Sequence, residues 1–129
     1  MDFAFDESTE AYRRAVRDFA TARLAPHYQD GDRTGRARPQ LTAELAQIGL
    51  LGLRVPAEAG GQGADAVTTG VALEEVARAD FNAAYVVLLC ALVADILGAA
   101  SAPAAALEAV ASGAALPCLA LTEPGHGRL

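Results

Sequence analysis

The sequence predicts an all-α, compact multi-helix fold that ends in one β-strand. Apolar side chains recur at three- and four-residue steps along most of the chain, and alanine, the best helix former, is abundant. Near the end of the chain, Leu116–Leu121 departs from this pattern with a short continuous apolar run that is typical of a buried strand. The 129 residues, 53% of them hydrophobic and 20% charged, are enough for one domain with a core and exclude intrinsic disorder.

The first predicted helix begins near Asp6 and ends before Pro26. Ser8 and neighbouring acidic residues suit a helix N-terminus because they satisfy its free N–H groups and its positive dipole end. Pro26 disfavours helical geometry at the residue before it, and the polar stretch His27–Arg38 then predicts an exposed loop. The apolar stripe of this helix consists of Tyr12, Val16, Phe19, Ala20 and Leu24.

The second predicted helix starts at Pro39 and closes at Gly49, which can adopt a left-handed conformation. The following stretch, Leu50–Val55, is apolar but contains a glycine and precedes a proline. We therefore expect an irregular buried connection there. The buried face of the helix is predicted to be Leu41, Leu45 and Ile48.

A glycine-rich turn, Gly60–Gly63, precedes the third predicted helix. A dinucleotide-binding loop would need a preceding strand, and Pro56 and the flanking helices do not provide that context, so a plain interhelical turn is the better interpretation. Asp65 or Thr68 can cap the helix. Its inward residues are predicted to be Val67, Val71, Val76 and Ala77.

The fourth predicted helix, Ala83–Leu97, is apolar on most sides, so we expect it to be buried all round. The charge-free run Phe81–Ala94 is shorter than the roughly 20 residues of a membrane span, which favours a core helix over a span. Asp95 must find a partner in such surroundings or lie at the solvated end of the helix, and structural pairing is the favoured interpretation. A short fifth helix begins at Pro103 and ends at Ser112 and Gly113.

Few side chains outside these apolar faces suggest chemistry. Glu74 and Glu75 point about 100° apart on one helix, so we expect them to be solvated or paired with Arg78 rather than to act together. His27 has no metal-ligand neighbours, which predicts a surface histidine and no metal site. The net charge of −6 argues against nucleic-acid binding. Both cysteines, Cys90 and Cys118, stand in apolar runs and are expected to pack as small hydrophobic residues.

The final segment has two interpretations. The strand Leu116–Leu121 has no partner strand in this sequence, so its backbone groups need another chain or domain to cover them. Leu119–Gly127 adds a hydroxyl and a glycine-rich turn whose N–H groups can bind an anion, although a simple turn explains the same residues. We therefore expect a fragment or a subunit of a larger assembly.

Taken together, the order of motifs resembles the acyl-CoA dehydrogenase family along essentially the whole chain. Members of that family have a helical N-terminal domain, a middle β-domain and a C-terminal helical domain, with FAD between them, usually in a homotetramer. The resemblance implies an N-terminal helical domain at residues 1–113 and the first strand and turn of a truncated β-domain at 114–129. The motifs that carry the resemblance are Phe19-Ala20, Leu24-Ala25-Pro26, Ile48-Gly49-Leu50-Leu51-Gly52-Leu53, Val55-Pro56, Gly60-Gly61-Gln62-Gly63, Glu74-Glu75-Val76-Ala77-Arg78-Ala79-Asp80, Ile96-Leu97-Gly98, Ser112-Gly113 and Leu121-Thr122-Glu123-Pro124-Gly125.

The resemblance also implies which residues meet the cofactor and the substrate. Thr122 is expected near the redox-active edge of the flavin ring. The residues expected to contact FAD are Leu119, Leu121, Thr122 and Gly127. Those expected to line the acyl pocket are Tyr85, Leu88 and Leu89.

The reaction implied by the resemblance is α,β-dehydrogenation of an acyl-CoA thioester, with hydride transfer to FAD. The catalytic base is a glutamate of the C-terminal domain, so no catalytic residue is expected in this chain, which is incomplete alone. The expected partners are acyl-CoA, the β- and C-terminal domains or a second subunit, and further copies in a homo-oligomer. The alternative is a non-catalytic helical interaction module or accessory subunit. No secretion signal or transit peptide is evident, which predicts a cytoplasmic protein.

Overall fold

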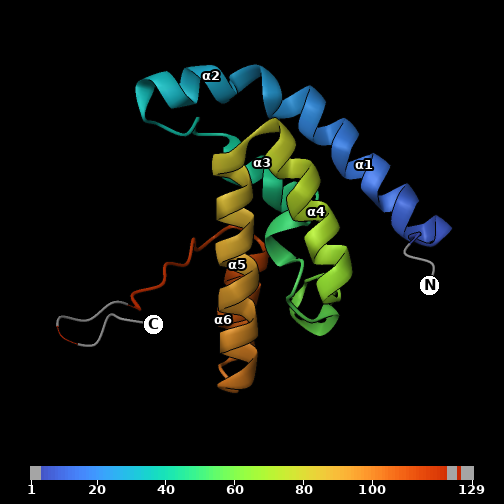
Figure 1. The fold of residues 1–129 in the computed structure, drawn as a ribbon. Coiled ribbons are helices and arrows are strands. Elements are labelled where there is room, and N and C mark those ends of the chain that lie inside the picture. The colour runs from blue at the N-terminus through green and yellow to red at the C-terminus, as the bar shows by residue number, and fades with distance from the viewer. Residues whose placement is uncertain (1–3, 122–124, 126–129) are drawn as a thin grey trace.

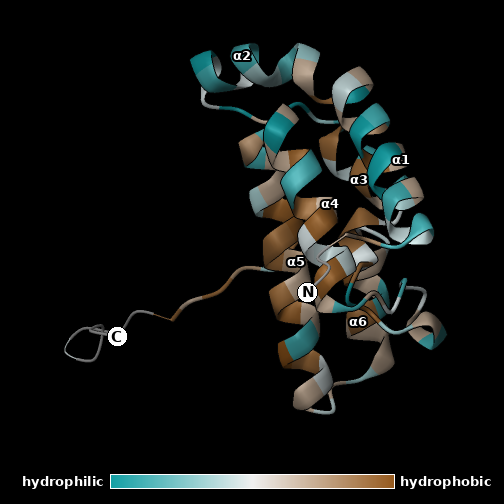
Figure 2. Cartoon of the chain, turned by 45° about the vertical axis from the view of Figure 1, so that its right-hand side comes forward, coloured by the Kyte–Doolittle hydropathy of each residue, from teal (hydrophilic) through white to brown (hydrophobic). Residues whose placement is uncertain are grey.

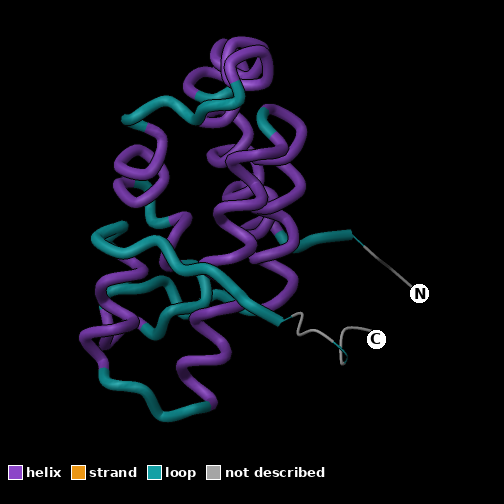
Figure 3. Tube along the Cα trace, turned by 90° about the vertical axis from the view of Figure 1, so that its left-hand side faces the viewer, coloured by secondary structure: helices purple, strands orange, loops and turns teal. Residues whose placement is uncertain are grey.

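Helices make up all the regular structure in the part of the chain that the computed structural model describes, residues 4–121 and 125 (Figures 1 and 3). The all-α prediction is therefore confirmed. The α-helices are α1 (Glu7–Arg23), α2 (Ala25–Thr34), α3 (Leu41–Gln47), α4 (Ala66–Ala79), α5 (Phe81–Ala99) and α6 (Ala104–Ala111), and the 3₁₀ turns are η1 (Leu50–Gly52) and η2 (Ala57–Ala59).

The loop predicted for His27–Arg38 is largely a helix, α2. Pro26 does end α1, but it also lies in the first turn of α2, where its missing N–H costs nothing and its fixed φ suits a helix. Gly35 closes α2 with a φ of 64°. None of the residues of α2 is buried. The sequence of this helix therefore lacks the apolar periodicity from which a helix could be predicted.

The core lies where α4 packs against α1 and against α5, and where α5 packs on η1 (Figure 1). Asp65 caps α4 by accepting a hydrogen bond from the Thr68 N–H, at 2.7 Å, and Asp80 caps α5 through the Ala83 N–H, at 3.0 Å. The helix starts therefore follow from local sequence. The buried residues of this core are Val16, Ala20, Leu24, Leu41, Leu45, Leu50, Leu51, Leu53, Ala72, Val76, Ala83, Ala84, Val87, Cys90 and Val110.

The irregular connection between α3 and α4 is buried, as predicted. Leu53 and Val55 have no exposed surface. The chain doubles back on itself there, because the Gln62 N–H donates to the Gly52 carbonyl at 2.9 Å and the Ala64 N–H donates to the Leu53 carbonyl at 2.7 Å. This pairing leaves no room for a side chain at residue 61, where a Cβ atom would lie 2.0 Å from the Val55 carbonyl oxygen.

The prediction that α5 is buried on every side is wrong. Phe81 is 65% exposed, Tyr85 is 54% exposed, and Leu92 and Ile96 are also exposed. By length and composition α5 qualifies as a membrane span, but the core helix of a soluble protein passes the same test, so this is weak evidence. The helix has one buried face, packed on α4, η1 and α6, and one apolar face that nothing in the described part of the chain covers.

The strand predicted at Leu116–Leu121 does not form in the described structure. The segment is an irregular chain that leaves the helical body next to α5 (Figures 1 and 2). A strand is stabilised by hydrogen bonds to a neighbouring strand, and the described residues provide none. Cys118 is exposed in this segment, contrary to its predicted packing, whereas Cys90 is buried as expected.

Candidate functional site

The exposed apolar side of α5 is the main candidate site. It consists of the exposed residues Phe81, Tyr85, Leu92 and Ile96 and the half-buried Leu88 between them, called the α5 face below. These residues recur at steps of three and four, so they form one row along the helix. Figure 2 shows the hydrophobic colouring along α5. A continuous exposed row of large apolar side chains on a helix is typical of a surface that another molecule or domain covers.

A shallow apolar groove between α4 and α5 extends this face. Its volume is about 180 Å³. Tyr85 and Leu88, two of the residues expected to contact substrate, lie in it together, whereas Leu89 is half-buried and lies outside it. The lining residues are Leu73, Ala77, Phe81, Ala84, Tyr85 and Leu88.

Sequence reasoning missed Phe81, Leu73 and Ala77 as parts of this groove. The spacing of Phe81 from Tyr85 and Leu88, by four and seven positions, was the signal that would have placed Phe81 on the same side of the helix. No comparable signal existed for Leu73 and Ala77, because their place beside α5 depends on how two helices pack.

A buried ion cluster ties α4 to α1 behind the groove. The carboxylate of Glu75, which is 2% exposed, accepts hydrogen bonds from Arg13 Nε at 2.7 Å, from Arg17 Nε at 2.9 Å and from Arg17 Nη2 at 2.8 Å. These bonds, chiefly those from Arg17, lower the pKa of Glu75 to about 2. Glu75 is therefore not solvated, and its predicted pairing with Arg78 exists but is, at 4.0 Å, the longest of its contacts with arginine.

Asp95 has the structural partner that the sequence predicted. Arg54, in the connection between η1 and η2, donates from Nε to both carboxylate oxygens of Asp95, at 3.0 and 3.2 Å. The Arg54 Nη1 atom also donates to the Ala64 carbonyl at 2.6 Å. The irregular connection is thereby joined to the C-terminal half of α5.

Of the four residues expected to contact the flavin, the structure describes Leu119 and Leu121. Leu119 is half-buried and Leu121 is 75% exposed in the segment that leaves the helical body. Thr122 and Gly127 lie outside the described residues. Within the described part of the chain, the backbone of residues 116–121 makes no hydrogen bond. This segment therefore presents apolar side chains and free backbone groups to its surroundings.

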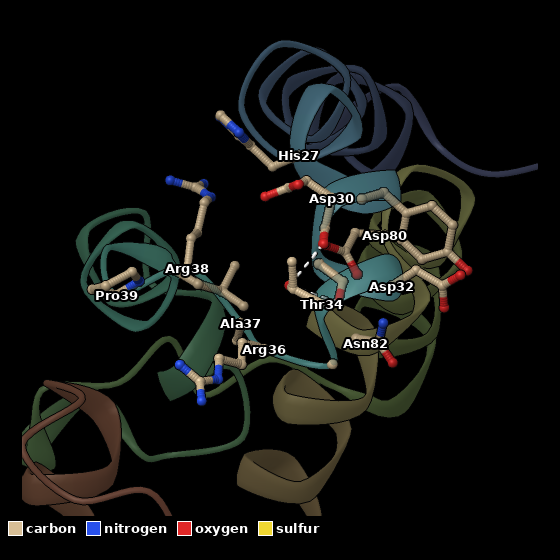
Figure 4. A pocket seen from close by; sticks show the side chains of 14 residues that line it. His27, Asp30, Asp32, Thr34, Arg36, Ala37, Arg38, Pro39, Asp80 and Asn82 are labelled. Atoms are coloured by element: carbon tan, nitrogen blue, oxygen red, sulfur yellow. Dashed lines mark hydrogen bonds between the residues drawn. The ribbon is translucent and has the colours of Figure 1, made fainter.

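A second, polar hollow of about 700 Å³ lies beneath α2 (Figure 4). Several of its charged groups are already engaged: Asp30 pairs with Arg33 at 2.6 Å, Arg38 pairs with Glu44, and Asp80 caps α5. His27 is exposed at its edge, as predicted. Nowhere among the described residues do three or more metal-binding side chains gather.

The described residues thus form a helical domain in which one apolar face of α5 is covered by no other described residue. A family model, "Acyl-CoA dehydrogenase, N-terminal domain", matches residues 6–114. The chain belongs to the acyl-CoA dehydrogenase family.

Individual relatives agree with this assignment. "Probable acyl-CoA dehydrogenase YngJ" of Bacillus subtilis is 34% identical over 131 residues, which cover 98% of this chain and 34% of the relative. "Short-chain specific acyl-CoA dehydrogenase, mitochondrial" of Mus musculus is 30% identical over 125 residues, which cover 94% of this chain and 30% of the relative. This chain thus spans about a third of the length of these relatives.

A solved structure gives the same result for the fold. Butyryl-CoA dehydrogenase from Megasphaera elsdenii superposes with a TM-score of 0.83 at 26% identity, over 98% of this chain and 35% of that one. The helices described above are therefore arranged as in an enzyme of the family.

Proposed function

We propose that this chain forms the N-terminal helical wall of the active site of a flavin-dependent acyl-CoA dehydrogenase. The enzyme would catalyse α,β-dehydrogenation of an acyl-CoA thioester with hydride transfer to FAD. The observation that carries the proposal is the α5 face, an uncovered row of large apolar side chains on the central helix of a chain that belongs to this family.

The α5 face supports binding of an acyl chain. Tyr85, Leu88 and Leu89 are the proposed substrate contacts, and the groove beside them is lined by apolar side chains. Burial of apolar surface is favourable by about 25 cal/mol per Å². A saturated chain lying along this helix would therefore gain binding free energy and would exclude water from the reacting carbons.

The segment that leaves the helical body suits a flavin laid along it. Leu119 and Leu121 offer apolar side chains, and the free backbone N–H and C=O groups between them can bind polar ring atoms or an adjoining strand. With Thr122 and Gly127, which lie outside the described residues, they are the proposed FAD contacts. The flavin, when bound, accepts the hydride from the β-carbon of the substrate.

The catalytic base belongs to another part of the enzyme in this proposal. A base must hold its carboxylate free to accept the α-proton. The buried carboxylate among the described residues, Glu75, accepts three hydrogen bonds from arginine and has a pKa of about 2, so it is unsuited to take a proton. The homo-oligomer, the cytoplasmic location and the domain boundary at residue 113 stay predictions of the sequence.

The test uses a fusion protein in which this full chain replaces the matched N-terminal region of Bacillus subtilis YngJ and is followed by the rest of YngJ. This fusion protein is called the fused enzyme below. We expect it to bind FAD and its flavin absorbance to bleach on addition of butyryl-CoA, while the chain alone holds no stoichiometric FAD. Stoichiometric binding of FAD by the chain alone would contradict the proposal that this chain and the rest of the enzyme form the FAD site together. A fused enzyme that binds FAD but is bleached by no acyl-CoA would instead favour a non-catalytic helical interaction module.

A further inference from the structure

Two alanines line the groove between α4 and α5, one on each side of the turn that joins these helices. α4 ends at Ala79 and α5 begins at Phe81, so Asp80 alone separates them. Ala77 precedes Asp80 by three positions and Ala84 follows it by four. The two helices pack against each other, so small side chains at these positions leave space that larger ones would fill.

Ala77 is held in place from the opposite side of α4. Glu75 lies two positions before it and therefore points to nearly the other side of the helix. There the Glu75 carboxylate accepts three hydrogen bonds from Arg13 and Arg17 on α1. At the near end of the groove, the Asp80 side chain caps the first turn of α5. The wall that carries Ala77 is thus fixed by contacts outside the groove.

The groove leads away from the segment proposed to contact the flavin. That segment, with Leu119 and Leu121, leaves the helical body beside the middle of α5 and runs away from the turn between α4 and α5 (Figures 1 and 2). The groove extends along α5 from Leu88 toward that turn, at Phe81. Because the reacting carbons must lie beside the flavin, the groove is placed to receive the far end of an acyl chain.

The chemistry of the groove suits hydrocarbon. The side chains that line it are aliphatic or aromatic, and none of them is charged. Each CH₂ group buried there raises affinity about fourfold. The α5 residues of the groove, positions 81–88, extend about 10 Å along the helix. The carbons of a butyryl group, joined by bonds of about 1.5 Å, span less than about 5 Å, so only longer chains reach from the flavin into the groove.

We infer that Ala77 is a specificity-determining residue: its small side chain keeps the groove open for the methyl end of acyl chains longer than butyryl. This inference rests on the proposed function and names the class of substrate. It assigns chain-length selection to α4, whereas the substrate contacts proposed above, Tyr85, Leu88 and Leu89, all lie on α5.

The experiment measures kcat/KM of the fused enzyme for butyryl-, hexanoyl-, octanoyl- and decanoyl-CoA. We expect the unmodified enzyme to favour one of the longer substrates over butyryl-CoA. Ala77→Leu places three more carbon atoms in the groove, so kcat/KM for that longer substrate should fall about tenfold or more. Activity with butyryl-CoA and FAD content should stay within about twofold. Ala15→Leu, the same change on the exposed side of α1, is the matched control and should leave the chain-length profile unchanged.

A groove filled by a side chain of another domain predicts a different pattern. Ala77→Leu would then lower kcat/KM equally for all four substrates or reduce FAD content, and either result would overturn the inference. If Ala77→Leu does not fold, as judged by thermal unfolding beside Ala15→Leu, then Ala77→Val decides. It adds two carbon atoms and should shift the preference toward butyryl-CoA to a smaller extent; an unchanged preference would overturn the inference.

The substrate series also separates the possible failures. If none of the four acyl-CoA substrates bleaches the unmodified fused enzyme, the proposed function fails and the inference fails with it. If butyryl-CoA alone is accepted, the proposed function stands and the groove does not receive the acyl chain. If longer substrates are accepted and Ala77→Leu keeps the chain-length profile, only the role of Ala77 fails.

Discussion

Substitution of Glu75 by glutamine removes the charge at the centre of the contact between α1 and α4. The buried carboxylate accepts three hydrogen bonds from two guanidinium groups. Glutamine has nearly the same volume, so no cavity forms, but its amide accepts fewer bonds and turns an NH₂ group toward arginine donors. The expected loss is therefore electrostatic.

The size of the loss in stability depends on how deeply Glu75 and its two arginine partners are buried. Removal of one partner from a buried ion pair costs about 3–5 kcal/mol. The side chains of Arg13 and Arg17 are 23% and 45% exposed, so they regain water when Glu75 is lost, and the lower end of that range applies. We expect Glu75→Gln to lower the free energy of unfolding by about 3 kcal/mol and Tm by roughly 10 °C.

The pH dependence of this loss has a definite sign. The pKa of Glu75 is lowered from its ordinary value of 4.5 to about 2 by hydrogen bonds from Arg17 and Arg13. Its stabilising contribution is therefore fully present above pH 4.5 and disappears as the pH falls toward 2. The difference in stability between the unmodified chain and Glu75→Gln should narrow across that interval.

Urea unfolding followed by circular dichroism, at neutral and at acid pH, measures both quantities. The adjacent Glu74 is the matched control, because its side chain is 55% exposed and its contact with Arg13 is 3.4 Å long. Glu74→Gln should cost less than about 0.5 kcal/mol. If the two variants are equally stable at neutral pH, the buried cluster does not hold α1 to α4 and the reasoning is refuted.

Three other changes test local features. Gly61→Ala should destabilise the chain by about 3 kcal/mol or more in the same urea assay, since its Cβ atom would lie 2.0 Å from the Val55 carbonyl oxygen; an unchanged midpoint would show that the loop can open. Tyr12→Phe should be neutral or stabilise by about 1 kcal/mol, because the buried hydroxyl has no hydrogen-bond partner in the described part of the chain; a loss above that size would reveal one. A thiol reagent should label Cys118 quickly and Cys90 slowly in the folded chain, because burial shields Cys90 and raises its pKa to about 11; equal rates, followed by mass spectrometry, would contradict this.

Local signals in the sequence were enough for most helices. Asp6, Asp65 and Asp80 cap α1, α4 and α5 through their own side chains, and these contacts span three residues. Gly49 adopts the left-handed conformation predicted for it, with a φ of 79°. Caps and glycine turns depend on neighbouring residues, and for that reason Asp65 and Gly49 could be predicted without knowledge of the fold, whereas the cap at Asp80, which starts α5 two residues earlier than predicted, was not recognised.

The α2 helix could not be predicted in the same way. It has no buried residue, and the usual apolar periodicity is absent. Pro26 was correctly interpreted as the end of α1, but a proline that ends one helix can also open the next. Two opposite outcomes thus share one local signal, and only the packing of the whole chain decides between them.

The candidate site was predictable in composition but not in geometry. The hydropathy of α5 predicts that the helix is buried. It does not predict whether residues of this chain or of another domain or molecule bury it. The burial of Glu75 was missed because its partners, Arg13 and Arg17, precede it by 62 and 58 residues. Tyr85 and Leu88 were placed by the family resemblance, and helix periodicity explains why they share one groove.

The central claim, that the α5 face is the acyl-binding wall, is tested most directly by photo-crosslinking. The fused enzyme is irradiated with an acyl-CoA that carries a diazirine near the end of its acyl chain, and the modified peptides are identified by mass spectrometry. The account predicts label on α5 at Tyr85, Leu88 or Leu89, and competition by butyryl-CoA. Competed label found only outside α5 would contradict it.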